Sequence, residues 1–280
     1  MSLAHSVLAV DPMVFPVRDV GRATTFLQRL LGGALEARPT GGVALSWEAA
    51  EVHCEPTLGG ASAGDPSAGL SVRWSGPLGP LLRNVKRASA TWSGPSERSS
   101  RGTSLLSVSI AGPDGLGVDV TTPFYDLALG GPSLRVAEGD QHDRAAVEGL
   151  LTGASLPLSG LDTAWRNALV AHSDADGPIA CAAVERHGTA ALLRSVVTAP
   201  SWRGVGLGEE LCWRVIARAF GSGATSVHLL TTTAERFFAR MGFHTVDRAT
   251  LPAALGASEE LRGACPASAI AMTFRDEGAA

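Results

Sequence analysis

The sequence predicts an α+β protein of two domains, residues 9–123 and residues 133–275, joined by a linker at residues 124–132. Three observations support this prediction. A strand–helix–three-strand pattern occurs twice before residue 123. Near residue 200, a buried strand runs into a glycine-rich loop and a helix. Between these two regions, Gly130-Gly131-Pro132 breaks any regular element. A length of 280 residues with 45% hydrophobic content is sufficient for two buried cores.

We expect the first domain to contain the unit βαβββ twice. Its first helix is amphipathic, begins after the turn at Asp19 and ends at Gly32-Gly33. The expected buried face of this helix carries Ala23, Phe26, Leu27, Leu30 and Leu31. The later elements are two short strands within residues 42–56, a strand at 70–74, a helix at 80–91, and strands at 104–110 and 116–122, the last two joined by Gly112-Pro113-Asp114-Gly115.

The segments PVRDVGRATTFLQRLLGG and GPDGLGVDV resemble the glyoxalase/bleomycin-resistance, or vicinal oxygen chelate (VOC), superfamily. Metal-using members of that family carry His or Glu where this chain has Pro12 and Asp119, and His53 is the one histidine nearby. The resemblance therefore implies a domain without a catalytic metal. Such a domain either binds a small molecule or forms a homodimer through residues 12–123, and the sequence leaves both open.

The second domain is expected to follow the order strand, two helices, antiparallel strands, loop and helix, strand, helix and final strands. The Asp174-Ala175-Asp176-Gly177 turn joins two of the antiparallel strands. The expected elements are strands at 133–136, 167–173, 178–187, 192–198, 226–230 and 268–274, with helices at 141–151, 161–165 and 209–220.

A glycine-rich loop stands between the strand at 192–198 and the helix at 209–220. It reads Arg203-Gly204-Val205-Gly206-Leu207-Gly208, with glycine at alternate positions. Glycines let backbone N–H groups converge, and the N-terminus of the helix adds a partial positive charge, so this loop is suited to an anion such as a pyrophosphate. A Walker loop would need Gly-Lys-Ser/Thr, and a dinucleotide fold would need an acidic residue after the next strand; the sequence has neither.

The glycine loop and the segment 231–243 together resemble the GNAT acetyltransferase superfamily. Residues 231–243 fit the family pattern Asn-x-x-Ala-x-x-x-Tyr-x-x-x-Gly-Phe, with Ala234, Gly242 and Phe243 in register. The ArsN-type branch associated with arsenic resistance has similar sequences in three places. These are LLTTTAERFFARMGF at residues 229–243, Val246-Asp247-Arg248, and CPASA at residues 265–269. This resemblance implies an acetyl-CoA-dependent N-acetyltransferase.

The resemblance also implies where acetyl-CoA would bind. The pyrophosphate is expected on Arg203, Gly204, Val205, Gly206, Leu207 and Gly208, and the pantetheine and thioester along Val196, Val197 and Thr198. Thr231, Ala234 and Phe238 are expected to complete the cofactor site. Thr231 replaces the family Asn, and Phe238 replaces the Tyr proposed to protonate the leaving thiolate. The chain has one tyrosine, Tyr125, which lies outside the predicted acetyltransferase domain.

Acyl transfer from a thioester to an amine needs a neutral amine and a route for its proton. Glu185 and His228, on predicted core strands, are the candidates for the base, and a water chain without a protein base is the alternative. Arg194 is a candidate for binding an anionic group of the acceptor by a bidentate contact. Ser195, Thr232 and Thr233 are candidates for lining the acceptor site.

The net charge, the N-terminal segment and the cysteine spacing exclude further classes of function and site. A net charge of −4 with scattered Lys and Arg argues against nucleic-acid binding. The N-terminus lacks the basic residues of a signal peptide and no run reaches the about 18 apolar residues of a membrane helix, so we expect a cytoplasmic protein. Cys54, Cys181, Cys212 and Cys265 have no zinc-site spacing, and we expect all four to be reduced core thiols. The ArsN-type resemblance implies the alternative role of a ligand for trivalent arsenic at Cys265.

Three functions remain after these exclusions. The first is acetylation of a small toxic or amino-acid-like amine, including an organoarsenical. The second is a binding protein, in which the first domain sequesters a ligand and the second senses acetyl-CoA without turnover. The third, acetylation of a protein amine, is disfavoured because the chain has no charged docking run.

Overall fold

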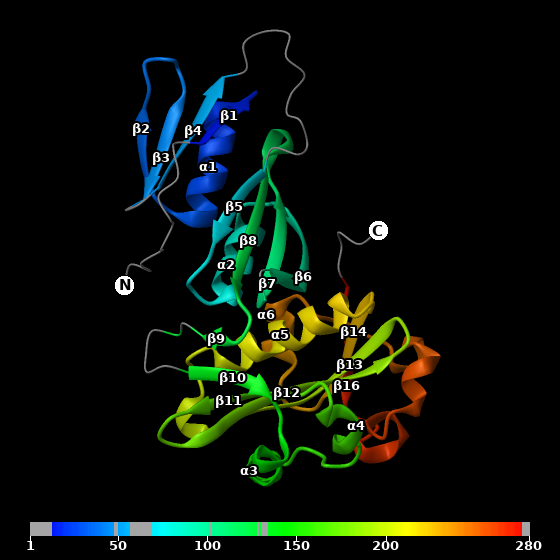
Figure 1. The fold of residues 1–280 in the computed structure, drawn as a ribbon. Coiled ribbons are helices and arrows are strands. Elements are labelled where there is room, and N and C mark those ends of the chain that lie inside the picture. Colours follow the sequence, from blue (N-terminus) through cyan, green and yellow to red (C-terminus); the bar gives the residue numbers. More distant parts are fainter. Residues whose placement is uncertain are drawn as a thin grey trace. The chain divides into compact units, whose positions relative to one another are not determined.

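The structure, a computed structural model, describes residues 13–47, 50–56, 69–100, 102–127, 129 and 134–275 (Figure 1). Its contacts divide the chain into two compact units. The first comprises Met1–Gly94 and Ser107–Thr122, and the second comprises Pro95–Leu106 and Pro123–Ala280. The second unit thus includes the segment predicted as a linker. Residues 9–12 of the predicted first domain, and 128 and 130–133 around the predicted linker, lie outside the described residues.

The first unit begins with one βαβββ motif. The amphipathic pattern places the α1 residues predicted to be inward, among them Leu27 and Leu30, in the core, and the Asp19 carboxylate caps the helix by accepting from the N–H of Arg22 at 2.9 Å. The sheet has the order β1-β4-β3-β2, with β1 parallel to β4. The elements are β1 (Met13–Val17), α1 (Val20–Leu31), β2 (Ala34–Ala37), β3 (Val43–Trp47) and β4 (Ala50–Pro56).

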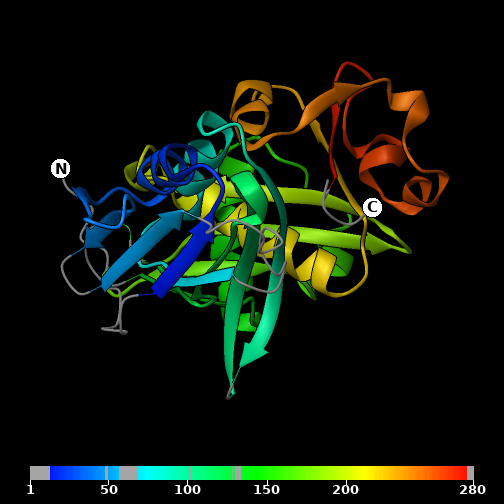
Figure 2. The same cartoon turned by 90° about the horizontal axis from the view of Figure 1, so that it is seen from above.

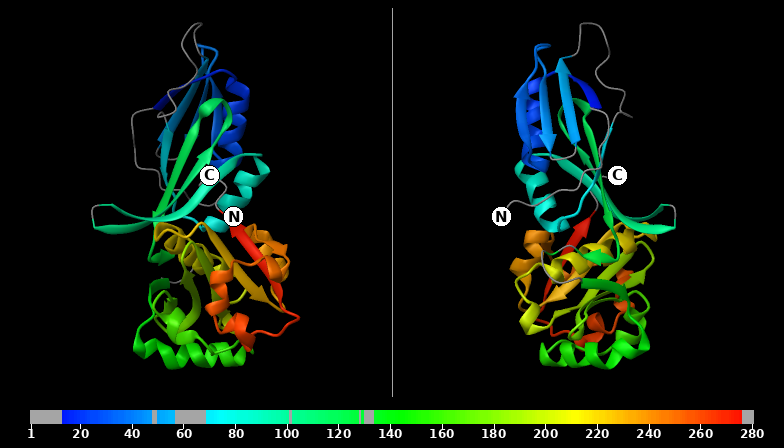
Figure 3. Two further views of the ribbon diagram at one scale, coloured as in Figure 1. Left: turned by 90° about the vertical axis from the view of Figure 1, so that its right-hand side faces the viewer. Right: turned by 60° about the vertical axis from the view of Figure 1, so that its left-hand side comes forward.

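A second βαβββ motif follows with the same sheet order, β5-β8-β7-β6, which confirms the predicted repeat. Its helix is shorter than predicted: it ends at Arg87 because Ser89 has a φ of 53° and Thr91 already begins a strand. The bounds of that strand, β6, were not predicted, because TWSGPSERSS has strand formers only at Thr91 and Trp92 and continues with Gly, Pro and polar residues. The elements are β5 (Gly69–Arg73), α2 (Leu78–Arg87), β6 (Thr91–Ser100), β7 (Thr103–Ala111) and β8 (Gly117–Pro123), seen from two further sides in Figure 3.

The second unit is built on an eight-stranded sheet of order β15-β16-β14-β13-β12-β11-β10-β9. Within the predicted linker, β9 pairs with β10, and Phe124 beside it is fully buried. The strands are β9 (Asp126–Leu127), β10 (Leu134–Glu138), β11 (Leu169–Ser173), β12 (Gly177–His187), β13 (Ala190–Thr198), β14 (Ser226–Thr231), β15 (His244–Val246) and β16 (Ile270–Arg275). The helices are α3 (Gln141–Gly153), α4 (Leu161–Trp165), α5 (Leu207–Gly221) and α6 (Glu235–Met241). This is the predicted order of elements.

Helices cover both faces of this sheet. Helix α5 lies against one face, and α3 and α4 lie against the other (Figure 1). Val147 and Leu151 of α3 and Leu161 of α4 pack on Cys181 and Ala183 of β12 in one buried cluster. Because side chains alternate along a strand, Glu185 shares this face with Cys181 and Ala183.

The segment between β15 and β16 covers the same face farther along the sheet. It consists of three short helical turns, drawn in orange and red in Figure 2: η3 (Arg248–Thr250), η4 (Ala253–Ala257) and the π-helical turn η5 (Glu260–Ala264). Leu255 of this segment is fully buried against Ala190 and Leu192 of β13. Across the described residues, no helix has the length and apolar character needed to cross a membrane.

Candidate active site

Strands β13 and β14 separate in the middle of the sheet. They are parallel neighbours over three consecutive pairs, which are Ala190 with Ser226, Ala191 with Val227 and Leu192 with His228. Beyond the last pair β13 runs on to Thr198 and β14 to Thr231, with no further pairing between these described strands. Parallel strands that stop pairing leave backbone N–H and C=O groups available along each edge.

On its other side β13 stays paired with β12, but the register shifts. Ala183 pairs with Arg194, whereas Cys181 pairs with Val197, so β13 holds one extra residue between the two pairs. This β-bulge contains Ser195, whose φ of 54° lies in the left-handed region. The bulge lies just beyond the point of separation, so Val196, Val197 and Thr198 form an open strand edge on the β14 side.

The glycine loop lies at the outer end of this edge. The Nε of Arg203 donates to the carbonyl oxygen of Thr198 at 3.1 Å, and a Cβ on Gly208 would lie 3.2 Å from the Thr198 hydroxyl. Gly204 and Gly206 have φ values of 84° and 92°, which favour glycine. Gly206 is the N-cap of α5 and has no side chain, so no side-chain cap occupies the first-turn N–H groups, as an anion site requires.

The residues predicted on the β14 side also lie near the start of a helix. The Thr231 hydroxyl accepts from the N–H of Ala234 at 3.0 Å, and Ala234 is the N-cap of α6. Phe238 is buried against the rings of Phe237 and Phe243, with centroids 4.9 and 5.7 Å away. Its ring has no proton to donate. Thr232 and Thr233 are exposed in the loop between β14 and α6.

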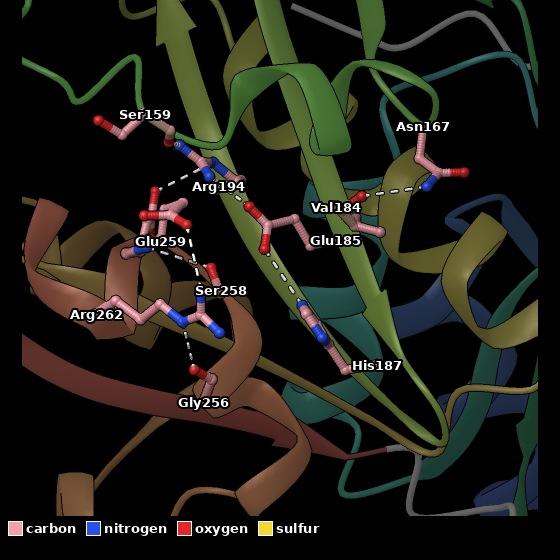
Figure 4. A network of polar contacts seen from close by, with 11 residues as sticks. Ser159, Asn167, Val184, Glu185, His187, Arg194, Gly256, Ser258, Glu259 and Arg262 are labelled. Carbon is pink, nitrogen blue, oxygen red and sulfur yellow. Dashed lines mark hydrogen bonds and ion pairs between the residues drawn. The ribbon is translucent and has the colours of Figure 1, made fainter.

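A buried ionic network lies on the α3/α4 face beside the bulge (Figure 4). The side chain of Arg194 is fully buried; it donates to the Glu185 carboxylate and, at 2.6 Å, to the carbonyl oxygen of Ser159, and its Nε lies 3.2 Å from Glu260. Sequence reasoning predicted Arg194 as an anchor for an anionic substrate group. In the structure two carboxylates of the protein already surround it, so the substrate role stays a prediction.

The pKa values of the two carboxyl groups shift in opposite directions. Burial favours the neutral form of Glu185, but hydrogen bonds from Arg194 and Ser258 outweigh it and hold its pKa below the usual value. Burial dominates at Glu260 and raises its pKa, with Arg194 opposing. Sequence reasoning missed Glu260, because no local pattern shows that the turn between β15 and β16 returns to β13.

Because Gly160 has no side chain, the side chains of Arg194 and Glu185 can lie close to its backbone. Its φ is 77°, and a Cβ there would lie 2.6 Å from Nη1 of Arg194 and 3.3 Å from Oε1 of Glu185. A side chain at this position would therefore displace the guanidinium from its carboxylate. His187 completes the network, with Nε2 3.2 Å from the second oxygen of Glu185.

His228, the second predicted base, is buried on β14 at the last pair before the separation. Its Nε2 lies 2.9 Å from the Ser226 hydroxyl, and its Nδ1 has no hydrogen-bond partner among the described residues. Burial lowers the pKa of His228 to about 4, with the charge of Arg275 contributing. The imidazole is therefore neutral at pH 7.

Tyr125, Cys181 and Cys265 are three further titratable groups of the second unit. Tyr125 belongs to the second unit, because the segment around it pairs with β10, and its hydroxyl accepts from Arg218 on the last turns of α5 at 2.9 Å. Burial raises the pKa of both Cys181 and Cys265 to about 12, so neither is a thiolate at neutral pH. Within the described part of the chain, no group of three or more His, Cys, Asp or Glu side chains is arranged to hold a metal ion.

Residues 164–245 match the family model described as the acetyltransferase (GNAT) domain. These residues include the bulge, the open edge and the glycine loop, and the second unit therefore carries an acetyltransferase domain. No curated protein sequence matches the chain.

Several solved structures are similar to part of the chain. N-acetylglutamate synthase from Neisseria gonorrhoeae, complexed with coenzyme A and N-acetyl-glutamate, is 18% identical with a TM-score of 0.45, and the match covers 56% of this chain and 37% of the synthase. Rv2747 from Mycobacterium tuberculosis, in complex with CoA, is 18% identical with a TM-score of 0.42, covering 50% of this chain and 98% of that one. A GNAT-family acetyltransferase from Staphylococcus aureus is 12% identical with a TM-score of 0.43, and the match covers 51% of this chain and 98% of the acetyltransferase.

Proposed function

We propose that the protein transfers an acetyl group from acetyl-CoA to the amine of a small molecule. The observation that carries this proposal is the open edge of β13, which begins at a bulge and ends at the glycine loop before α5. This edge lies within the residues that match the acetyltransferase domain. It offers backbone hydrogen-bonding groups to an extended chain and an anion site at one end of that chain.

The residues present fit acetyl-CoA. The pyrophosphate would be held by Arg203, Val205, Leu207 and the three glycines of the loop, where the first-turn N–H groups of α5 point. The pantetheine would extend along Val196, Val197 and Thr198, which would place the thioester near the bulge. Thr231, Ala234 and Phe238 would flank it from the β14 side.

The chemistry requires attack of the amine nitrogen on the thioester carbonyl carbon, followed by loss of the thiolate. One proton leaves the amine and one is taken up by the thiolate, so the net reaction releases a thiol and an amide. Glu185 and His228 both bind protons weakly at pH 7, since the pKa of each is lowered. We propose that water carries the amine proton away, and that Glu185 positions Arg194.

The acceptor site would lie beside the ionic network, with Ser195, Thr232 and Thr233 as further contacts. Binding of an anionic acceptor group by Arg194 would require Glu185 or Glu260 to yield part of the guanidinium. An amino-acid-like or organoarsenic amine is the proposed acceptor class, on the ArsN-type resemblance. A cytoplasmic location and a homodimer through the first unit are further proposals.

A second candidate function is binding without turnover. Phe238 favours it, because its buried ring cannot protonate a leaving thiolate. In this alternative the second unit senses acetyl-CoA, and the first unit, on its VOC-like resemblance, sequesters a small molecule.

Thiol release from acetyl-CoA, measured against a panel of small amines, separates the two functions. Gly206→Asp places a carboxylate in the proposed anion site, and we expect it to raise the KM for acetyl-CoA at least about tenfold. Gly188→Asp is the matched control, since Gly188 also has a positive φ, 67°, with open space around it. Tight acetyl-CoA binding without thiol release for any amine would favour the sensor, and equal effects of the two substitutions would contradict the proposed pyrophosphate site.

A further inference from the structure

We propose that the hydroxyl of Ser195 donates a hydrogen bond to the carbonyl oxygen of the bound thioester. This inference rests on the proposed function and adds a residue to its reaction centre. Three observations lead to it: the backbone conformation of Ser195, its unpartnered hydroxyl and its place at the start of the open edge.

Ser195 has an unfavourable backbone conformation in a buried place. Among the described residues, four that are not glycine have a positive φ: Ser89, Asp114, Ser155 and Ser195. Ser89 and Ser155 are exposed and Asp114 is half-buried, whereas Ser195 is 7% exposed. A serine in the left-handed region costs free energy that glycine would save, and such residues concentrate at functional sites.

The side chain of Ser195 has a second cost. Its Oγ is buried and makes no hydrogen bond to any described residue. A buried hydroxyl without a partner is destabilising relative to alanine, and natural structures contain few of them. No described residue pairs with this hydroxyl, so a ligand that accepts a hydrogen bond from it would remove this cost.

The position of Ser195 identifies that ligand. It occupies the bulge between the Ala183–Arg194 and Cys181–Val197 pairs, at the inner end of the open edge. Thr198, three residues away or roughly 10 Å along the strand, contacts the glycine loop. A coenzyme with its pyrophosphate on that loop and its pantetheine along the edge brings its thioester to the bulge. Negative charge develops there on the carbonyl oxygen, where a positioned donor is most effective.

The test compares Ser195→Ala with wild type in two measurements on the full chain. Calorimetric titration with acetyl-CoA and with CoA gives the first, because CoA lacks the carbonyl. We expect Ser195→Ala to weaken acetyl-CoA binding about 3- to 10-fold and to leave CoA binding unchanged. Thiol release gives the second, and we expect kcat to fall about 10- to 100-fold.

Two further variants keep the test decisive. Ser89→Ala changes an exposed serine of the same backbone conformation, and we expect it to match wild type. Ser195→Gly removes the hydroxyl and relieves the left-handed strain, so it folds even if alanine at 195 does not, and we expect it to show the same loss of discrimination. An unchanged ratio of acetyl-CoA to CoA affinity in both Ser195 variants would overturn the inference. A wild type that binds neither compound would instead overturn the proposed function.

Discussion

Nε of Arg214 on α5 donates to the backbone carbonyl oxygen of Phe124 at 2.7 Å, and both residues are fully buried. The same guanidinium lies 2.7 Å from the carboxylate of Glu210 and donates to the carbonyl oxygens of Pro123 and Asp126. The segment that precedes the acetyltransferase domain is thereby fixed to the helix that begins at the glycine loop.

Arg214→Met should lower the free energy of unfolding by about 3 to 5 kcal/mol, because it leaves the Glu210 carboxylate buried without its cation. Urea denaturation measures this change. Arg135→Met, on an exposed position of β10, is the control and should change stability by no more than about 0.5 kcal/mol. The double variant Glu210→Leu/Arg214→Met should recover part of the loss, and a single variant as stable as the control would contradict the interpretation.

Gly160→Ala should destabilise the second unit more than Gly188→Ala does. Both glycines have a positive φ, so alanine costs about 1 to 2 kcal/mol at either place. At Gly188 nothing lies within 4 Å of the added Cβ, whereas at Gly160 it meets the Arg194 guanidinium, which is held by Glu185 and Ser159. Thermal or urea unfolding of the two variants isolates the clash as their difference. Equal losses would show that the network moves aside freely.

Glu260→Gln should gain stability relative to wild type as the pH rises. Burial raises the folded-state pKa of Glu260. The stability that this group contributes to the folded protein is therefore complete below its unfolded-state pKa, near 4.5, and is lost as the pH rises through its folded-state pKa. Glutamine does not titrate, so the difference between variant and wild type should be larger at pH 8 than at pH 4 in urea denaturation. Glu259→Gln, with a half-exposed side chain in an ion pair with Arg262, should show no such trend.

The order of elements could be predicted from the sequence because strong local signals mark them. The apolar face of α1, the capping Asp19 and the glycines before α5 all act within a few residues. The same reasoning missed the bounds of β6, whose TWSGPSERSS has strand structure through its pairing in the sheet rather than through its own composition.

The candidate site was predictable only in part for the same reason. The glycine loop and residues 196–198 follow from a local pattern. The partners of Arg194 are Glu185 and Ser159, which lie 9 and 35 residues away along the chain, and Glu260, which follows two further strands. No local pattern encodes those contacts. The bulge at Ser195 likewise depends on the register of two strands.

His228 should make the protein less stable as the pH falls from 7 towards 4. Its folded-state pKa is lowered to about 4 from the usual 6.5, so the unfolded chain binds the proton more readily. The stabilisation is complete above the unfolded pKa and is lost as the pH falls through the folded value. A shift of this size corresponds to a loss on the order of 3 kcal/mol.

Comparing His228→Gln with wild type in urea denaturation at pH 7 and pH 4.5 measures this loss, because other groups titrate alike in both proteins and cancel. Wild type should lose stability relative to the variant over this range. His142→Gln is the control, since the His142 side chain is 96% exposed and should make no difference.

The lowered pKa of His228 also has a kinetic consequence. If His228 accepted the amine proton with an ordinary pKa, kcat/KM for thiol release would fall as the pH drops below 6.5. An imidazole that stays neutral and takes no proton predicts no fall in kcat/KM near pH 6.5. A fall near pH 6.5 that His228→Gln removes would identify His228 as the base.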